Sequence, residues 1–169
     1  MKMRLLLTPL VAFALFVPVG AAQARATVGK FSDTVTETGS TALPECLPPD
    51  LVGSLSLTSV VTGHFTETTT GFHVAGTNTE SYRVDFPDGR YVLGVATSHF
   101  AFNVSGSGRT TTKTVIREPR TIYDANGDRI GRVFIHAVSV ITYRDANGNG
   151  MPDDGEITAN VDRFFFTCH

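Results

Sequence analysis

Alternation of apolar and polar residues over long stretches is the feature that most restricts how this chain can fold. In the segment FHVAGTNTESYRVDF, residues 72–86, the side chains of Phe72, Tyr82 and Val84 fall on even positions, while the odd positions carry mostly polar groups. A period of two places alternate side chains on opposite faces of a β-strand. The segment is therefore predicted to be one long strand with one buried face.

Two polar residues interrupt the apolar side of that strand. Asn78 and Glu80 occupy even positions in its middle. Either a β-bulge shifts the alternation at this point, or the two side chains point into the interior. The sequence leaves both interpretations open.

The rest of the chain has the same character, with runs rich in Val, Thr, Phe and Tyr separated by short turns containing Gly, Asn or Asp. No amphipathic helical stretch interrupts these runs. Residues 25–50 form an N-terminal arm or contribute a first strand. The other predicted strands are residues 55–68, 72–86, 90–104, 109–123, 129–144 and 157–168.

This order predicts an all-β protein, an antiparallel up-and-down meander of six to eight strands, with residues 51–169 as its domain. Closure into a small barrel would remove the two exposed sheet edges. A sandwich is less compatible, because sequential tight hairpins lack the long crossovers of Greek keys. The expected architecture is therefore a small barrel.

Residues 1–24 have the organisation of a secretory signal peptide. Lys2 and Arg4 precede an apolar run, and Ala22, Gln23 and Ala24 form an A-x-A cleavage site. The apolar run is shorter than the roughly 20 residues of a membrane span, so none is expected in the mature chain. A secreted, extracellular protein is predicted.

The charge of the chain argues against one class of partner. The net charge is −2 at pH 7, and the basic residues form no cluster. Nucleic-acid binding normally requires a basic surface. No nucleic-acid partner is therefore expected.

The two cysteines lie far apart in the sequence, Cys46 near the start of the folded part and Cys168 next to the last residue. In an exported protein, a pair of cysteines indicates a disulfide before it indicates a catalytic or metal-binding pair. An intramolecular bond would tie the two ends of the domain together. Two free thiols or an intermolecular bridge are the alternatives.

The sequence DANGNGMPDDGE, residues 145–156, has the spacing of a calcium-binding loop. Oxygen ligands recur at alternate residues around a Gly that permits a sharp turn, and a final Glu can supply two oxygens. The predicted ligands are Asp145, Asn147, Asn149, the backbone carbonyl of Met151, Asp153 and Glu156.

The residues flanking this loop are predicted strands, unlike the helices of an EF-hand. The loop instead resembles the DxNGNGxPDxxE calcium repeats of thrombospondin type 3 modules, which implies a bound Ca²⁺ with a stabilising role. A polar turn that binds nothing is the alternative. The related sequence DANGD, residues 124–128, lacks the later ligands and is predicted to be a plain hairpin turn.

Catalytic motifs are sparse. The sequence contains no GxSxG elbow and no HExxH metal motif. In a barrel, His136 could approach Glu80, and the two side chains could act as an acid and base pair. A histidine held by local hydrogen bonds is the simpler interpretation, so whether the chain is an enzyme stays open.

Between Cys46 and Cys168, the Thr-rich long strands, the central FAFNVSGSG and the terminal FFFTC resemble a family of uncharacterised small proteins secreted by actinobacteria. The resemblance implies a lipocalin-like or allene-oxide-cyclase-like barrel. It carries no established catalytic residues.

Three functions follow from these features. The first is a monomeric, calcium-stabilised barrel that binds a small, partly apolar ligand. The others are an extracellular or cell-envelope protein-interaction module with a filled core, and an allene-oxide-cyclase-like isomerase. The aromatic residues expected to line a cavity or fill the core are Phe65, Phe72, Tyr82, Phe100, Phe102, Phe134 and Phe164.

Overall fold

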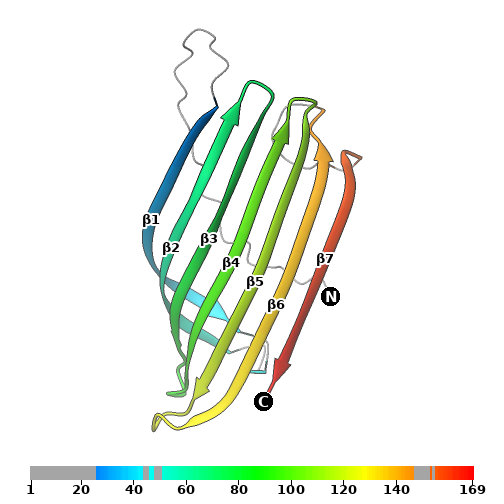
Figure 1. The fold of residues 1–169 in the computed structure, drawn as a ribbon. Helices are drawn as coiled ribbons and strands as arrows, with labels where there is room; N and C mark the ends of the chain where they lie inside the picture. Colours follow the sequence, from blue (N-terminus) through cyan, green and yellow to red (C-terminus); the bar gives the residue numbers. More distant parts are fainter. Residues whose placement is uncertain (1–25, 44–45, 48–50, 147–152, 154) are drawn as a thin grey trace.

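A computed structural model describes residues 26–43, 46–47, 51–146, 153 and 155–169. Seven antiparallel strands form one sheet in which the spatial order follows the chain order (Figure 1). No helix in these residues is long and apolar enough to cross a membrane. The strands are β1 (Thr27–Ala42), β2 (Val52–Thr68), β3 (Gly71–Asp85), β4 (Tyr91–Ser105), β5 (Arg109–Tyr123), β6 (Arg129–Arg144) and β7 (Ile157–Cys168).

The predicted meander is confirmed, and β5, β6 and β7 begin and end at the predicted residues. Of the two interpretations of residues 25–50, the first strand is correct, because β1 pairs with β2 along its whole length. The predicted turn at residues 124–128 is also present, with the Asp124 amide donating to the Asp128 carbonyl over 2.9 Å.

Cross-strand register assigns each side chain to one of two faces. Val84 on β3 pairs with Val92 on β4, which pairs with Ile122 on β5, and all three are buried. Directly paired residues in an antiparallel sheet share a face. We call the face that carries these three residues the inner face, and the opposite one the outer face.

The hydrophobic core occupies one end of the inner face. The connection between β1 and β2 lies over this end, where Leu43 joins the core and Leu47 and Leu51 pack against it. Figure 1 shows the end of β1 and the start of β2 bent behind the other strands. The buried core residues are Leu43, Val84, Phe86, Val92, Ile122, Val133 and Ile135.

The predicted disulfide is present. Cys46, in the β1–β2 connection, is bonded to Cys168 at the end of β7, with a Cα–Cα distance of 5.9 Å and a sequence separation of 122. The bond therefore joins a segment that follows one edge strand to the end of the other edge strand.

The predicted closure into a barrel is not found in the residues that the structure describes. There, β1 pairs with β2 and β7 pairs with β6, and the two edge strands do not pair with each other. In a closed barrel, β1 would lie beside β7. Here Cys46 of the β1–β2 connection is bonded to β7. The edges are thus joined by a covalent bond, without a hydrogen-bonded ladder between them.

Candidate functional site

Asn78 and Glu80 point to the inner face. The register of β3 with β2 and with β4 runs without a shift through both residues, which excludes a bulge at this position. Of the two interpretations of the sequence, the interior orientation is therefore correct. The two side chains lie between the hydrophobic core and the far end of the same face.

A short chain of hydrogen bonds connects these residues to β2. The Ser59 hydroxyl donates to Asn78 Oδ1 over 2.7 Å, and Asn78 Nδ2 donates to Glu80 Oε1 over 2.8 Å. Because the Asn78 amide uses its oxygen toward Ser59 and its nitrogen toward Glu80, it fixes the position of one Glu80 oxygen.

A second group lies next to Glu80. The Tyr82 hydroxyl donates to the Glu118 carboxylate, and Arg120 Nε donates to Glu118 Oε1 over 2.7 Å. The side chains of Arg120 and Glu118 are only 10% and 14% exposed. A paired and largely desolvated carboxylate and guanidinium hold each other in a defined geometry.

Tyr82 reaches Glu118 by crossing β4 at a glycine. Gly94 is the direct cross-strand partner of Tyr82, and a Cβ atom at Gly94 would lie 2.2 Å from the tyrosine ring. Any larger residue at this position would displace the ring. Gly94 is therefore what lets a side chain from β3 contact one from β5.

Burial and neighbouring acids set the protonation of the group. Burial raises the pKa of Glu80; the hydrogen bond from Asn78 opposes this shift, and the negative charges of Glu118 and Glu37 add to it. Burial also raises the pKa of the Tyr82 hydroxyl, with Arg120 acting in the opposite direction. Tyr82 is thus a neutral donor, while Glu80 retains a proton to higher pH than an ordinary carboxyl group.

An aromatic patch occupies the part of the inner face beyond this polar group. The rings of Phe31 and Phe100 stack at 6.4 Å between centroids across the two glycines that separate them, Gly63 and Gly76. Phe72 lies 6.3 Å from Phe65 and 6.3 Å from Phe102. We define the patch as Phe31, Phe65, Phe72, Phe100 and Phe102.

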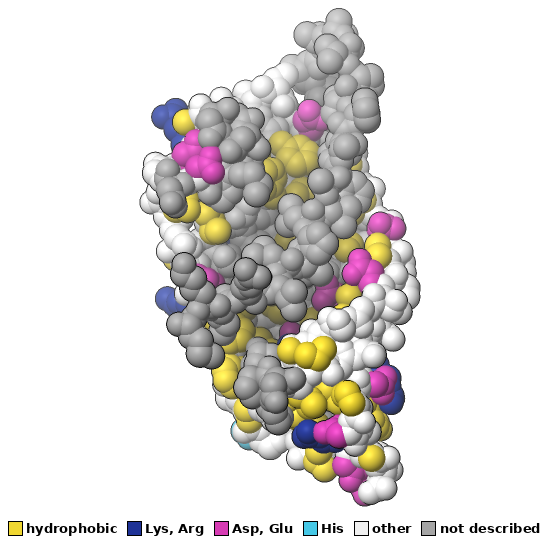
Figure 2. All heavy atoms as spheres, turned by 180° about the vertical axis from the view of Figure 1, so that it is seen from behind, with side chains coloured by type: hydrophobic (Ala, Val, Ile, Leu, Met, Phe, Trp, Pro, Cys, Tyr) yellow, Lys and Arg dark blue, Asp and Glu magenta, His cyan; other side chains and the backbone are white. Residues whose placement is uncertain are grey.

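The inner face therefore changes from core to polar group to aromatic patch along its length. Figure 2, turned to the side opposite that of Figure 1, shows hydrophobic side chains interspersed with acidic ones. An apolar surface with a few converging polar groups is typical of a site for a small molecule.

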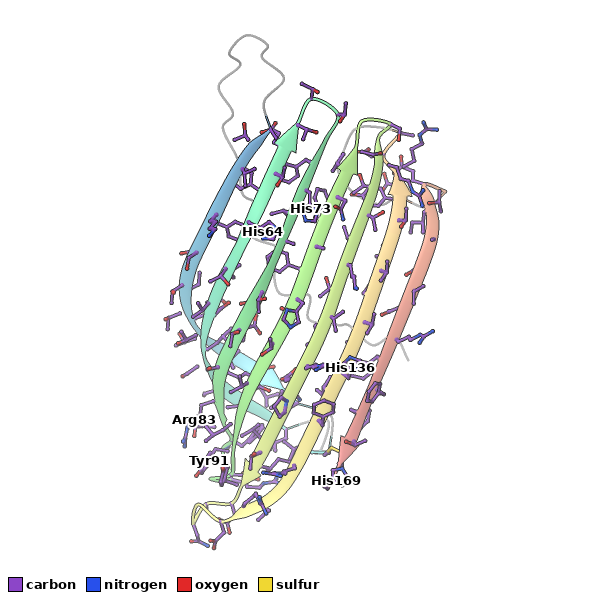
Figure 3. The ribbon with its side chains drawn as sticks, in the orientation of Figure 1. His64, His73, Arg83, Tyr91, His136 and His169 are labelled. Carbon is purple, nitrogen blue, oxygen red and sulfur yellow. A yellow bond between two sulfur atoms is a disulfide. The ribbon has the colours of Figure 1, made fainter. Side chains whose placement is uncertain are left out.

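The structure does not bring Glu80 and His136 together. Glu80 pairs with Ala96 on the inner face, whereas His136 pairs with Arg117 and Phe165 on the outer face. The His136 ring lies 4.9 Å from that of Phe165 (Figure 3). The possible acid and base pair therefore does not form, because side chains alternate between the two faces of a strand and these two lie on opposite faces.

The same parity corrects one of the predicted aromatic residues. Phe134 lies on the outer face and is 39% exposed, since its neighbours Val133 and Ile135 take the inner positions. The other aromatic residues in the predicted set lie on the inner face, where Phe164 is nevertheless exposed: Phe65, Phe72, Tyr82, Phe100, Phe102 and Phe164.

Sequence reasoning missed Ser59, Glu118 and Arg120. A signal for the last two was present, because Glu118 and Arg120 fall at alternate positions between the apolar Ile116 and Ile122. This is the same interruption that marked Asn78 and Glu80 on β3. The sequence alone does not show that the polar residues of β3 and β5 lie close together, because that depends on the register between the strands.

The predicted calcium loop is described only in part. Asn147, Asn149 and Met151 lie outside the described residues. The Glu156 carboxylate accepts hydrogen bonds from the Ala146 amide over 2.8 Å and from the Asp153 amide over 3.4 Å.

These contacts turn the Glu156 carboxylate toward the amides of Ala146 and Asp153, and carboxylate oxygens are the kind of ligand that a hard cation takes. In the described portion of the chain, no group of three or more His, Cys, Asp or Glu side chains is arranged to hold a metal.

No protein-family model, curated protein or solved structure matches this chain. The similarity to the actinobacterial barrels and to thrombospondin type 3 repeats therefore stays a hypothesis. A functional assignment has to come from the chemistry of the inner face.

Proposed function

We propose that this chain is a secreted binding protein that holds a small amphiphilic ligand against the inner face of its sheet. The aromatic patch contacts the apolar part of the ligand. Glu80 and its neighbours contact a head group that donates hydrogen bonds or carries a positive charge. The inner face takes the role that the barrel interior was expected to have.

The observation that carries this proposal is the position of Glu80. A half-buried carboxyl group with a raised pKa lies on the inner face, with Asn78 holding one of its oxygens. A face that served only as a core would be expected to carry apolar side chains there, because burying a carboxyl group costs free energy.

The charge balance of the group indicates the kind of head group. Glu37, Glu80 and Glu118 interact electrostatically, and the guanidinium of Arg120 is paired with Glu118. Ionised Glu80 would therefore favour an ammonium or another donor over a carboxylate. We infer an alkyl or aryl amine, or an alcohol, as the ligand class.

The predicted calcium ion and signal peptide belong to the same proposal. The disulfide suits an oxidising, extracellular environment. A Ca²⁺ ion held by Asp145, Asp153, Glu156 and their neighbours would stabilise the β6–β7 hairpin. Neither feature takes part in contacting the ligand.

The test is a fluorescence titration with two probes, a dansylated alkyl amine and a dansylated alkyl carboxylate of equal length. We expect the amine to bind more tightly, and Glu80→Gln to weaken amine binding about tenfold, the loss of a charge-assisted contact. The matched control is Asp128→Asn, which removes an exposed carboxylate from the β5–β6 turn.

The amine affinity should also depend on pH. Because the pKa of Glu80 is raised, a falling pH removes its charge earlier than it removes the charge of an ordinary carboxyl group. Amine binding should therefore weaken at pH values that are still above the range in which ordinary carboxyl groups titrate. Equal affinities for the two probes, or a pH profile unchanged in Glu80→Gln, would contradict the proposal.

A protein-interaction role is favoured by one separate observation, the exposed phenylalanines of β7. An isomerase of the allene-oxide-cyclase type loses its proposed acid and base pair, because Glu80 and His136 lie on opposite faces.

A further inference from the structure

Strand β7 is an exposed apolar edge. All 12 of its residues are exposed, and Phe164, Phe165 and Phe166 have 38%, 50% and 46% of their surfaces accessible. Figure 1 shows the strand at one side of the sheet, with β6 as its neighbour. A long apolar edge strand offers unpaired backbone groups and a surface for another strand.

The backbone hydrogen bonds at the end of β7 show which residues offer those groups. Arg132 and His169 exchange two hydrogen bonds, the Arg132 amide to the His169 carbonyl over 2.8 Å and the reverse bond over 2.9 Å. In an antiparallel ladder such pairs alternate with non-bonded ones. Residues 161, 163, 165 and 167 thus bond to β6, and Asp162, Phe164 and Phe166 direct their amides and carbonyls outward.

The other edge of the sheet has a different character. Along β1, the charged side chains of Lys30, Asp33 and Glu37 are spread over the strand, whereas the two charged residues of β7, Asp162 and Arg163, are adjacent and leave residues 164–166 without charge. Charges on an edge strand are a common protection against pairing with another chain. The apolar edge is therefore β7, and this asymmetry disfavours head-to-tail pairing of β7 with β1.

We propose that β7 pairs with β7 of a second copy of this chain, antiparallel and about a two-fold axis. The axis passes through Phe165, so that Phe165 faces its own copy and Phe164 faces Phe166 of the other molecule. This interface is independent of the ligand site proposed above, and it departs from the monomer expected from the sequence.

Phenylalanine pairing favours this register over those centred on Phe164 or Phe166, and charge disfavours two others. With the axis at Asp162 or at Arg163, a like-charged pair would lie directly opposite across the interface, which is unfavourable. With the axis at Phe165, both charged residues lie away from their copies, and six phenylalanines form cross-strand pairs. Aromatic pairs in this position stabilise a sheet.

The size of the contact predicts a weak dimer. A phenylalanine buries about 150–250 Å² when fully covered. Six half-exposed rings would cover on the order of 500 Å², below the roughly 1,200 Å² at which specific stable interfaces begin. The association is therefore expected at concentrations on the order of 10–100 μM, the range of weak, transient complexes.

Sedimentation velocity of the purified full chain, from 1 to 300 μM, tests the proposal. We expect a monomer that converts to a dimer with rising concentration, and Phe165→Lys should raise the dissociation constant about tenfold or more by placing two charges face to face. The matched control is Leu93→Lys, which changes a 40% exposed apolar residue on the central strand β4 and should leave the dimer intact.

A cysteine variant tests the register and does not depend on how Phe165→Lys folds. In Phe165→Cys the two new thiols would face each other at a non-hydrogen-bonded pair, where Cβ atoms are close enough for a disulfide. Arg163→Cys would leave them four residues apart and uncrosslinked. A monomer at 300 μM, equal crosslinking of both variants, or a dimer that Phe165→Lys leaves unchanged would overturn the proposal.

Discussion

Individual glycines decide how closely the aromatic side chains of the inner face can lie on the sheet. Gly63 and Gly76 are directly paired and stand between Phe31 and Phe100, whose rings extend over them. A ring that covers a cross-strand glycine shields backbone that would otherwise be open, which compensates for the low strand propensity of that glycine. The aromatic patch thus depends on residues that contribute no side chain.

This arrangement predicts that Gly76 cannot be enlarged. A Cβ atom there would lie 2.4 Å from the Thr62 carbonyl oxygen and 2.5 Å from the Phe100 ring. Gly76→Ala should therefore lower the free energy of unfolding by about 1–3 kcal/mol, as measured by urea denaturation.

The matched substitution is Gly39→Ala in β1. A Cβ atom at Gly39 would meet nothing within 4 Å. The change should leave stability within about 1 kcal/mol or raise it slightly, because Ala restricts the unfolded chain more than Gly does. Equal losses in the two variants would mean that strand propensity, and not contact with the ring, determines the effect.

At the scale of the elements, the hairpins account for most of the agreement between sequence and structure. Their strands are long and alternate in polarity, and their turns carry residues suited to tight reversals. The β6–β7 hairpin differs in having a connection of twelve residues, Ile157 being the first residue of β7. We propose that this connection is long because it binds Ca²⁺.

Calcium should therefore raise the thermal stability of the protein relative to chelator. The dissociation constant of such a site is about 10⁻⁴–10⁻³ M. At a free calcium concentration ten times the dissociation constant, the expected stabilisation is about 1.4 kcal/mol, or a few degrees in Tm. Differential scanning calorimetry at 0 and 10 mM calcium measures the difference.

The control is the double variant Asp145→Asn and Glu156→Gln, in which this calcium-dependent difference should vanish. The difference, and not the Tm itself, is the relevant quantity, since the Glu156 carboxylate also accepts hydrogen bonds from the Ala146 and Asp153 amides. Equal Tm values of the parent protein with and without calcium would show that the loop is only a turn.

At the scale of the whole molecule, the disulfide links the two edges of the sheet. The two edge strands do not pair in the described residues, and the core that the β1–β2 connection covers lies at one end. The bond from Cys46 to Cys168 holds that connection to β7. Without it, the connection could move away from the core.

Reduction should consequently destabilise the protein by more than the loss of one local contact. For a sequence separation of 122, the chain-entropy model gives about 4–5 kcal/mol. Urea denaturation with and without reductant measures this loss.

The variant in which both Cys46 and Cys168 are replaced by serine should unfold with the midpoint of the reduced protein and should not respond to reductant. A loss below about 1 kcal/mol on reduction would show that the connection stays on the core without its covalent link.

The sequence by itself determined the all-β class, the meander order and the bounds of β5, β6 and β7, and it favoured the pairing of the two cysteines. Each of these depends on local alternation, on turn residues or on the small number of cysteines present. It also marked Glu80 as an inward polar candidate, although a bulge could not be excluded.

Only the tertiary structure decided that β1 and β7 do not pair within the described residues, that Glu80 lies beside Glu118 and Arg120, and that His136 lies on the other face. These features depend on the register between strands, and a shift of one residue reverses every side chain. The register is determined by many cross-strand contacts between residues that are distant in the chain. It therefore cannot be predicted from any single stretch of the sequence.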